Sequence, residues 1–483
     1  MVRQSKKTPK TPAPPPAETI STTVALSEVL SAGLRLEASA FSVRSRNAIA
    51  ALRTAGYPLQ ALYGDSGLCR EAHNAFRFRR IWVNADRGVP FLSGVDIIYM
   101  RPVAEHFISR RLTPRLDELM IAKGDVLISC SGTIGNVSLA SGTMVGSALS
   151  QDVIRLRAAD ADTAGYVTAF LRSRYGRPQL EQLTYGSVIA HIEPEHLTHI
   201  VIPELPPIRR IAVGRLMCEA SDLRDQANDL LAEADRLLHD TLRLPPIEEG
   251  SSGPVTSSVR ASDLRRRLDA SFHAPVAIQA EKNVAALAGE LATLGDERVT
   301  KEIRPITKFR KRVYVQRGGI PLVSTRQLFQ IDPIDVHALA KGAHTKDLPE
   351  ISLKHNMICI TRSGTIGRVQ IIPKYMAGWA ASEHATRAIA APGMNAGYLY
   401  AWLVSDYGKC LLTRHSYGSV ILEIDRDMIA SVPIPLPGQD VQDQIGNLVL
   451  RANDLRDQAW RKEREAIGQL EVIFGDVQTS LKF

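Results

Sequence analysis

The sequence is an internal duplication, and no other feature constrains the possible folds as strongly. Six strings recur in the same order; four of the six pairs share an offset of 232 residues, and the other two share an offset of 231. The pairs are Leu36–Ser39 with Leu268–Ser271, Arg77–Arg80 with Lys308–Lys311, Gly88–Pro90 with Gly319–Pro321, Ser131–Gly135 with Ser363–Gly367, Tyr185–Ile189 with Tyr417–Ile421, and Leu223–Ala227 with Leu455–Ala459. A period this long is not that of a solenoid, so each copy is a domain with an appendage.

Each copy divides into a mixed part and a helical part. The mixed part alternates short apolar runs such as 124–129 with helix-like stretches such as 165–174, punctuated by Gly and Pro. We therefore predict an α+β fold: two tandem domains, each followed by a long helix, with the two helices pairing as an antiparallel coiled coil. The predicted divisions are a disordered tail (1–23), first domain (24–206), central helix (207–243), linker (244–262), second domain (263–437), distal helix (438–475) and C-terminal tail (476–483).

The two helical parts carry matching heptad stripes. In the first, apolar residues are spaced alternately by four and three, which is the pattern of a helix-pairing surface. The stripe comprises Leu216, Ala220, Leu223, Ala227, Leu230, Ala234 and Leu237, and its repeat comprises Leu448, Ala452, Leu455 and Ala459 before Lys462 interrupts it. The small alanines allow close approach, and a helix of ~33 residues would be roughly 50 Å long at about 1.5 Å per residue.

Composition and charge exclude several classes of protein. No apolar run approaches the ~18 residues that a membrane span needs, and the Lys- and Pro-rich start lacks the apolar core of a signal peptide. The five cysteines are scattered without a CxxC pair, which predicts reduced thiols and a cytoplasmic protein. The net charge of +8 favours polyanionic partners.

Motifs of known catalytic chemistry are missing. The sequence contains no GxxxxGK[ST] loop, HExxH, GxSxG or dinucleotide fingerprint, and no histidine cluster with metal-ligand spacing. The two Ser-Gly-Thr-Ile-Gly strings lack a phosphate-binding lysine, so we interpret them as turns. We expect no catalytic residues, no metal and no cofactor in this chain.

Two basic-aromatic strings are the best functional signal. If Arg77-Phe78-Arg79-Arg80-Ile81-Trp82 and Lys308-Phe309-Arg310-Lys311-Arg312-Val313-Tyr314 lie on strands, alternate basic residues share one face. Such a row binds phosphates, and arginine reads guanine edges. A solvated strand with its aromatics turned to the core is the alternative, and recurrence in both copies favours nucleic acid.

Other residues extend this candidate surface. Arg101, Arg110, Arg111 and Arg115 add charge to the first domain, whereas the second has Arg326, Lys341 and Lys346 at corresponding places. The hydroxyls of Tyr185, Ser187, Tyr417 and Ser419 either contact phosphates or belong to tight structural turns. Because the two copies differ, the two domains need not recognise the same bases.

Taken together, these motifs resemble the specificity (S) subunit of Type I restriction-modification systems over residues 24–475. Each copy has Ser-Gly-Thr-Ile-Gly, a Gly-Ser about fifty residues later, a Pro-rich exit and a long helix. The resemblance implies two target-recognition domains reading the halves of a split double-stranded DNA site. It also implies that the helices set the spacer and dock methyltransferase subunits that carry S-adenosylmethionine, and that a restriction subunit completes the nuclease.

Departures from the family pattern keep other functions open. The family's usual Glu-Gln after the Pro-rich exit is imperfect here: Gln442, followed by Ile445, fits in the second copy, but Arg210 and Val213 stand at these places in the first. A DNA-recognition component of another phage-defence assembly is the main alternative. A nuclease acting alone and a pure coiled-coil scaffold are the others. We expect the protein in the prokaryotic cytoplasm, associated with the nucleoid.

Overall fold

The computed structural model describes residues 23–31, 37–132, 134–185, 190–247, 256, 258–265, 267–287, 289–309 and 311–475. The predicted tails fall almost entirely outside these ranges, as do Ser187, Arg310 and residues 248–255 and 257 of the predicted linker. In the described part, the duplication seen in the sequence is also a duplication of topology.

Within the described ranges, each half contains the same three sheets, with strands connected in the same order. In the first half these are β1-β10, β2-β9-β6-β7 and β3-β5-β4-β8, formed by β1 (Leu59–Ala61), β2 (Glu71–Asn74), β3 (Trp82–Val83), β4 (Gly88–Leu92), β5 (His106–Ser109), β6 (Val126–Ser129), β7 (Val137–Leu139), β8 (Ala148–Leu149), β9 (Val153–Arg157) and β10 (Val201–Pro203).

The second half repeats this arrangement as β11-β20, β12-β19-β16-β17 and β13-β15-β14-β18. Its strands are β11 (Glu290–Thr293), β12 (Thr300–Pro305), β13 (Tyr314–Val315), β14 (Ile320–Val323), β15 (His337–Leu339), β16 (Ile358–Thr361), β17 (Val369–Ile371), β18 (Ala380–Ala381), β19 (Ala385–Ala390) and β20 (Pro433–Leu436). The predicted α+β class with two tandem domains is confirmed.

Shorter helices accompany the sheets of each half. They are α1 (Leu26–Ser31), α2 (Val43–Thr54), α3 (Ala161–Arg172) and α4 (Arg177–Gln182) in the first half, and α6 (Pro275–Ala285), α7 (Leu348–Ile351), α8 (Ala396–Val404), α9 (Asp406–Thr413) and α10 (Arg426–Ala430) in the second. The helix α3 is buried along most of its length, and so is its counterpart α8, because each lies between its own sheets and the long helices.

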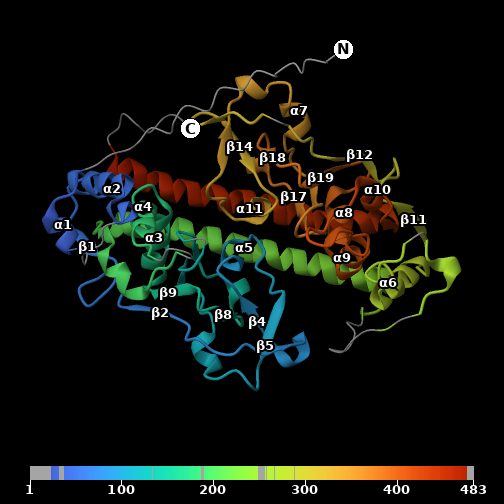
Figure 1. Ribbon diagram of the computed structural model, residues 1–483, viewed down its shortest axis with the longest axis horizontal. Helices are drawn as coiled ribbons and strands as arrows, with labels where there is room; N and C mark the ends of the chain where they lie inside the picture. The colour runs from blue at the N-terminus through green and yellow to red at the C-terminus, as the bar shows by residue number, and fades with distance from the viewer. Residues whose placement is uncertain are drawn as a thin grey trace, which may run out of the picture.

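Two helices of 36 residues, α5 (Pro207–Leu242) and α11 (Gln439–Phe474), form the axis of the molecule. They cross Figure 1 side by side, with the sheets of the two halves on opposite sides. The start of α5 packs with the end of α11, since Val213 and Met217 share a core with Leu470 and Phe474. At the other end Leu231 shares a core with Val449, so the predicted antiparallel pairing is confirmed.

The alanines of both heptad stripes are buried, but their leucines are only half-buried. Ala220 and Ala227 on α5 are inaccessible, as are Ala452 and Ala459 on α11. The half-buried positions are Leu216, Leu223, Leu230, Leu448 and Leu455. Because each helix packs against a recognition domain as well as its partner, its apolar face is wider than a strict coiled-coil stripe. Residues such as Met217 and Leu231, which lie one position further on, fill the rest of that face.

The helix pair does not keep the two domains apart, because the domains touch each other directly. Tyr99 of the first half and Gln330 of the second form an antiparallel β-bridge. The backbone N–H of Met100 donates to the carbonyl of Phe329 at 2.9 Å, and the N–H of Ile331 donates to the carbonyl of Ile98 at 2.8 Å. The heptad pattern predicts contacts between the two helices and says nothing about contacts between the domains. The sequence therefore gave no indication of this contact.

Among the helices that the structure describes, none combines the length and apolar character that a membrane crossing requires.

Candidate nucleic-acid interface

The described basic residues of the two strings lie in loops, so the prediction that they lie on strands is wrong; Trp82 and Tyr314, at the ends of the strings, begin strands β3 and β13. One loop joins β2 to β3 and the other joins β12 to β13. In each half these two strands belong to different sheets, so the connecting backbone must leave one hydrogen-bonded ladder before entering the next. The basic residues are therefore carried on a crossover between sheets.

The alternation of side chains nevertheless holds in the first loop. Arg77 and Arg79 are exposed, while Phe78 between them packs against the hydrophobic core of the sheet β3-β5-β4-β8. In the second loop Phe309 is buried, and Lys308 and Lys311 are exposed. The aromatic ring thus anchors each loop and leaves its cations directed to solvent.

The last basic residue of each string is held by the protein itself. The Arg80 guanidinium lies 5.1 Å from the centre of the Phe91 ring and 3.5 Å from Ser150 Oγ. The Arg312 guanidinium lies 4.9 Å from the centre of the Phe309 ring and forms an ion pair of 2.5 Å with Glu383. These two arginines position the loops, whereas Arg77, Arg79, Lys308 and Lys311 remain directed to solvent.

An exposed aromatic ring in contact with a tilted histidine ring lies beside each basic loop. The Trp82 ring is 5.1 Å from His106, and the Tyr314 ring is 4.8 Å from His337. Trp82 and Tyr314 are 47% and 45% exposed, which is unusual for such large rings.

Strand register explains why the same aromatic-histidine pair recurs. Trp82 pairs with Ile108 across β3 and β5, and Tyr314 pairs with Leu339 across β13 and β15. In both halves the histidine is therefore the diagonal neighbour two residues away, within reach of an aromatic side chain. Sequence reasoning missed His106 and His337, because two-residue strands leave no period from which to read a register.

The predicted tyrosines lie close to acidic groups. Tyr185 donates its hydroxyl proton to Glu193 at 2.8 Å, and Tyr417 donates to Asp425 at 2.7 Å. The hydrogen bond to Asp425 raises the pKa of Tyr417 to about 12. A phenol has one proton to donate, so contact with a phosphate would require these pairs to open. Ser419 is exposed, and its role, like that of the tyrosines, stays a prediction.

The remaining predicted arginines fall into two groups. Arg110 and Arg111 are exposed just after β5, and Arg110 donates to the carbonyl of Gly88 at 3.2 Å. Arg101, in contrast, lies within electrostatic range of Asp235 on α5. Arg326 lines a cavity of about 230 Å³ together with Tyr99. The structure therefore brings Arg101 and Arg326 to the contact between the domains and not to the basic loops.

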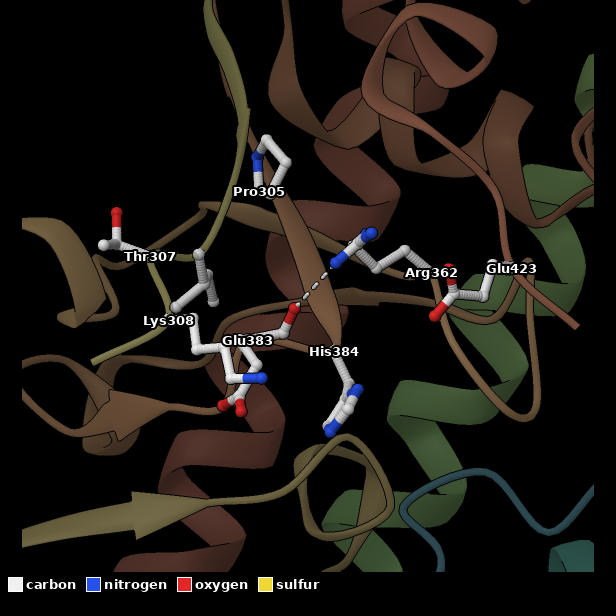
Figure 2. A pocket seen from close by; sticks show the side chains of 8 residues that line it. Pro305, Thr307, Lys308, Arg362, Glu383, His384 and Glu423 are labelled. Atoms are coloured by element: carbon white, nitrogen blue, oxygen red, sulfur yellow. Dashed lines mark hydrogen bonds between the residues drawn. The ribbon is translucent and has the colours of Figure 1, made fainter. Parts of the chain in front are cut away.

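A polar pocket of about 400 Å³ opens behind the second basic loop (Figure 2). Lys308 lies on one side of it and Glu423 on the other, and Arg362 donates across it to the backbone oxygen of Glu383 at 3.3 Å. His384 also lines the pocket. Mixed charge of this kind suits hydrogen bonding to a polar ligand.

The corresponding positions in the first half carry different groups. At the offset of the repeat, Cys130 replaces Arg362, Gln151 replaces Glu383, Asp152 replaces His384 and His191 replaces Glu423. The two halves therefore share a backbone but present different side chains on equivalent surfaces.

Within the residues that the structure describes, no group of three or more His, Cys, Asp or Glu side chains is arranged to hold a metal ion.

Comparison with known proteins finds a family match within the second half. Residues 304–450 match the family model of the Type I restriction modification DNA specificity domain. No curated protein matches the chain.

Three solved structures align with most of the chain. The S subunit of the Type I restriction-modification system from M. genitalium is 13% identical over 86% of this chain and 96% of its own, with a TM-score of 0.33. The HsdS subunit of Thermoanaerobacter tengcongensis is 15% identical over 87% and 97%, with a TM-score of 0.27. A chain from a structure concerned with assembly of the type I R-M system is 15% identical over 88% and 98%, with a TM-score of 0.26.

The second copy of the duplicated α+β fold therefore contains a match to a Type I DNA specificity domain, and the first copy repeats its strand order. The resemblance drawn from the sequence, to the specificity subunit of a Type I restriction-modification system, is confirmed by the domain match.

Proposed function

We propose that this chain is the specificity subunit that directs a Type I adenine methyltransferase and restriction complex to a split, asymmetric site on double-stranded DNA. The observation that carries the proposal is the specificity-domain match of the second half, together with the repetition of that domain's strand order in the first. Two recognition domains in one chain suit two half-sites.

The asymmetry of the site follows from the differences between the halves. Direct readout depends on which donors and acceptors a domain presents to base edges. Since the side chains around the equivalent pockets differ, the two domains would select different bases and the complete site would not be palindromic.

Catalysis is assigned to partners and not to this chain. Two methyltransferase subunits would bring S-adenosylmethionine and dock on the paired helices α5 and α11, and restriction subunits would add cleavage. The assembly would work in the cytoplasm, associated with the nucleoid. This chain would contribute DNA binding through the basic loops and no reactive group of its own.

Methylome sequencing of the native host, with and without the gene, tests the proposal. Loss of one split, asymmetric adenine-methylated motif on deletion is the expected result. An unchanged methylome would contradict a role in methylation. DNA recognition for another phage-defence assembly would then become the better assignment, provided that the purified chain selects a split sequence from random duplex DNA.

A further inference from the structure

The contact between the two domains is built from equivalent residues of the two repeats. We call Ile98-Tyr99-Met100 and Phe329-Gln330-Ile331 the interdomain bridge. At the local repeat offset of 231, Ile98 corresponds to Phe329 and Met100 to Ile331. The two hydrogen bonds of the bridge are therefore equivalent, with the donor and acceptor domains exchanged between them. Such reciprocity is the mark of a twofold contact, here within one chain.

Side chains of both domains pack together around this pseudo-twofold axis. Met100 is 4% exposed and packs in the core of the second domain, where the Gln370 amide lies 3.6 Å from its sulfur. The Arg368 guanidinium lies 4.6 Å from the Tyr99 ring centre and 4.2 Å from the Phe329 ring centre, so one cation contacts an aromatic ring from each domain.

Ion pairs extend the bridge onto the helices. Asp332 follows the bridge in the second domain and pairs with Arg172 of α3 at 3.1 Å and with Arg464 of α11. Its counterpart in the first domain is Arg101, which lies within electrostatic range of Asp235 on α5. The two equivalent loops thus face the helix pair with opposite charges, which fixes one orientation of each domain.

The bridge is also coupled to the candidate DNA-binding surface. Met100, Phe329 and Phe309 belong to one hydrophobic core, and Phe309 anchors the second basic loop. Packed cores transmit displacement instead of absorbing it, so the bridge and this loop move as a unit.

We propose that the interdomain bridge, and not the helix pair alone, fixes the separation of the two DNA half-sites. This inference rests on the proposed function. One base pair of added spacer moves a half-site by about 3.4 Å and rotates it by about 35°, given 10–10.5 base pairs per turn of about 34–36 Å. If only the helix pairing connected the two domains, each domain could tilt to reach a displaced half-site. Domains that are also joined at the pseudo-twofold axis cannot make this movement.

Weakening the bridge tests this directly. The full-length chain is first given random duplex DNA, and the selected split site is resynthesised with its spacer changed by one or two base pairs. We expect wild type to bind the one-base-pair variants about tenfold or more weakly, and Met100→Ala and Arg368→Ala to reduce that discrimination to about threefold or less. Arg174→Ala is the matched control, since that guanidinium also stacks on a tyrosine, 5.0 Å from the Tyr175 ring, outside the bridge.

A disulfide across the bridge provides the converse test. Tyr99 and Gln330 face each other between the two hydrogen bonds, where Cα atoms lie about 4.5 Å apart, a separation that a disulfide spans. In the variant Y99C with Q330C, the reduced protein lacks the Tyr99 ring and should accept altered spacers, and oxidation should restore the wild-type preference. Loss of binding to the selected site on oxidation would mean that the bridge must open, and would overturn the inference.

The outcomes separate this inference from the proposed function. A chain that selects no DNA sequence refutes the function. A chain that selects a split sequence, but whose bridge variants keep the wild-type spacer preference, refutes the bridge as a determinant and leaves the helices to set the spacing.

Discussion

At the scale of single residues, one buried carboxylate joins three parts of the molecule. Glu463 of α11 pairs with Arg172 of α3 at 2.7 Å and with Arg224 of α5 at 2.6 Å. Replacing it with glutamine leaves the largely buried Arg224 guanidinium without its anion, and leaves Arg172 with Asp332 as its anionic partner. We expect Glu463→Gln to lower the free energy of unfolding by about 3–5 kcal/mol, measured by urea denaturation. Glu465→Gln, at an exposed position on the same helix, is the control and should change stability by less than about 0.5 kcal/mol.

The same carboxylate predicts a pH dependence. Burial alone would raise the pKa of Glu463, but Arg172 and Arg224 hold it at about 2, below its ordinary value of 4.5. A lowered pKa in the folded state stabilises the fold above pH 4.5, and this contribution disappears as the pH falls toward 2. Wild type should therefore lose stability between about pH 4.5 and 2 more steeply than Glu463→Gln, as unfolding midpoints would show. Parallel losses in the two proteins would contradict the assignment.

At the scale of elements, paired glycines let each recognition domain approach its long helix. Gly165 of α3 faces Gly214 of α5, and Gly397 of α8 faces Gly446 of α11, so that an added Cβ would overlap backbone or Asn395. We expect Gly214→Ala and Gly446→Ala each to cost about 2 kcal/mol or more, because the overlapping atoms belong to packed elements. Gly468→Ala, where α11 has open space, should instead stabilise by up to about 1 kcal/mol. Thermal unfolding of the three variants provides the comparison, and equal effects at all three positions would exclude close crossing as the reason.

Some of these elements could be predicted from the sequence, and others could not. Both long helices and the duplication follow from local periodicity and from repeated strings, which need no knowledge of distant contacts. The glycine pairs were visible too, since Gly165 and Gly397 stand at the repeat offset, but their role depends on which helices cross. The basic loops were misjudged as strands because alternation of Arg77, Phe78 and Arg79 also suits a loop anchored by one ring. The interdomain bridge lacks any local pattern, since it pairs residues more than 200 positions apart.

At the scale of the whole molecule, the two basic loops should add their effects on DNA binding. Each solvent-directed cation that neutralises a phosphate contributes about 0.9 to the slope of log K against log salt. Arg79→Gln in the first domain and Lys308→Gln in the second should each reduce that slope by about 1, and the double variant by about 2. Lys282→Gln on α6, an exposed lysine that belongs to neither basic loop, is the control.

Titration of the full-length chain against its selected duplex at several salt concentrations measures these slopes. Because phosphate contacts carry no direct sequence information, both substitutions should weaken binding to selected and unrelated DNA to a similar extent. A change in the preferred sequence with an unchanged slope would place these side chains on base edges. If Lys308→Gln matched the control in both slope and sequence preference, the second loop would lie outside the interface, and the exposed Tyr314–His337 pair beside it would lose its place there as well.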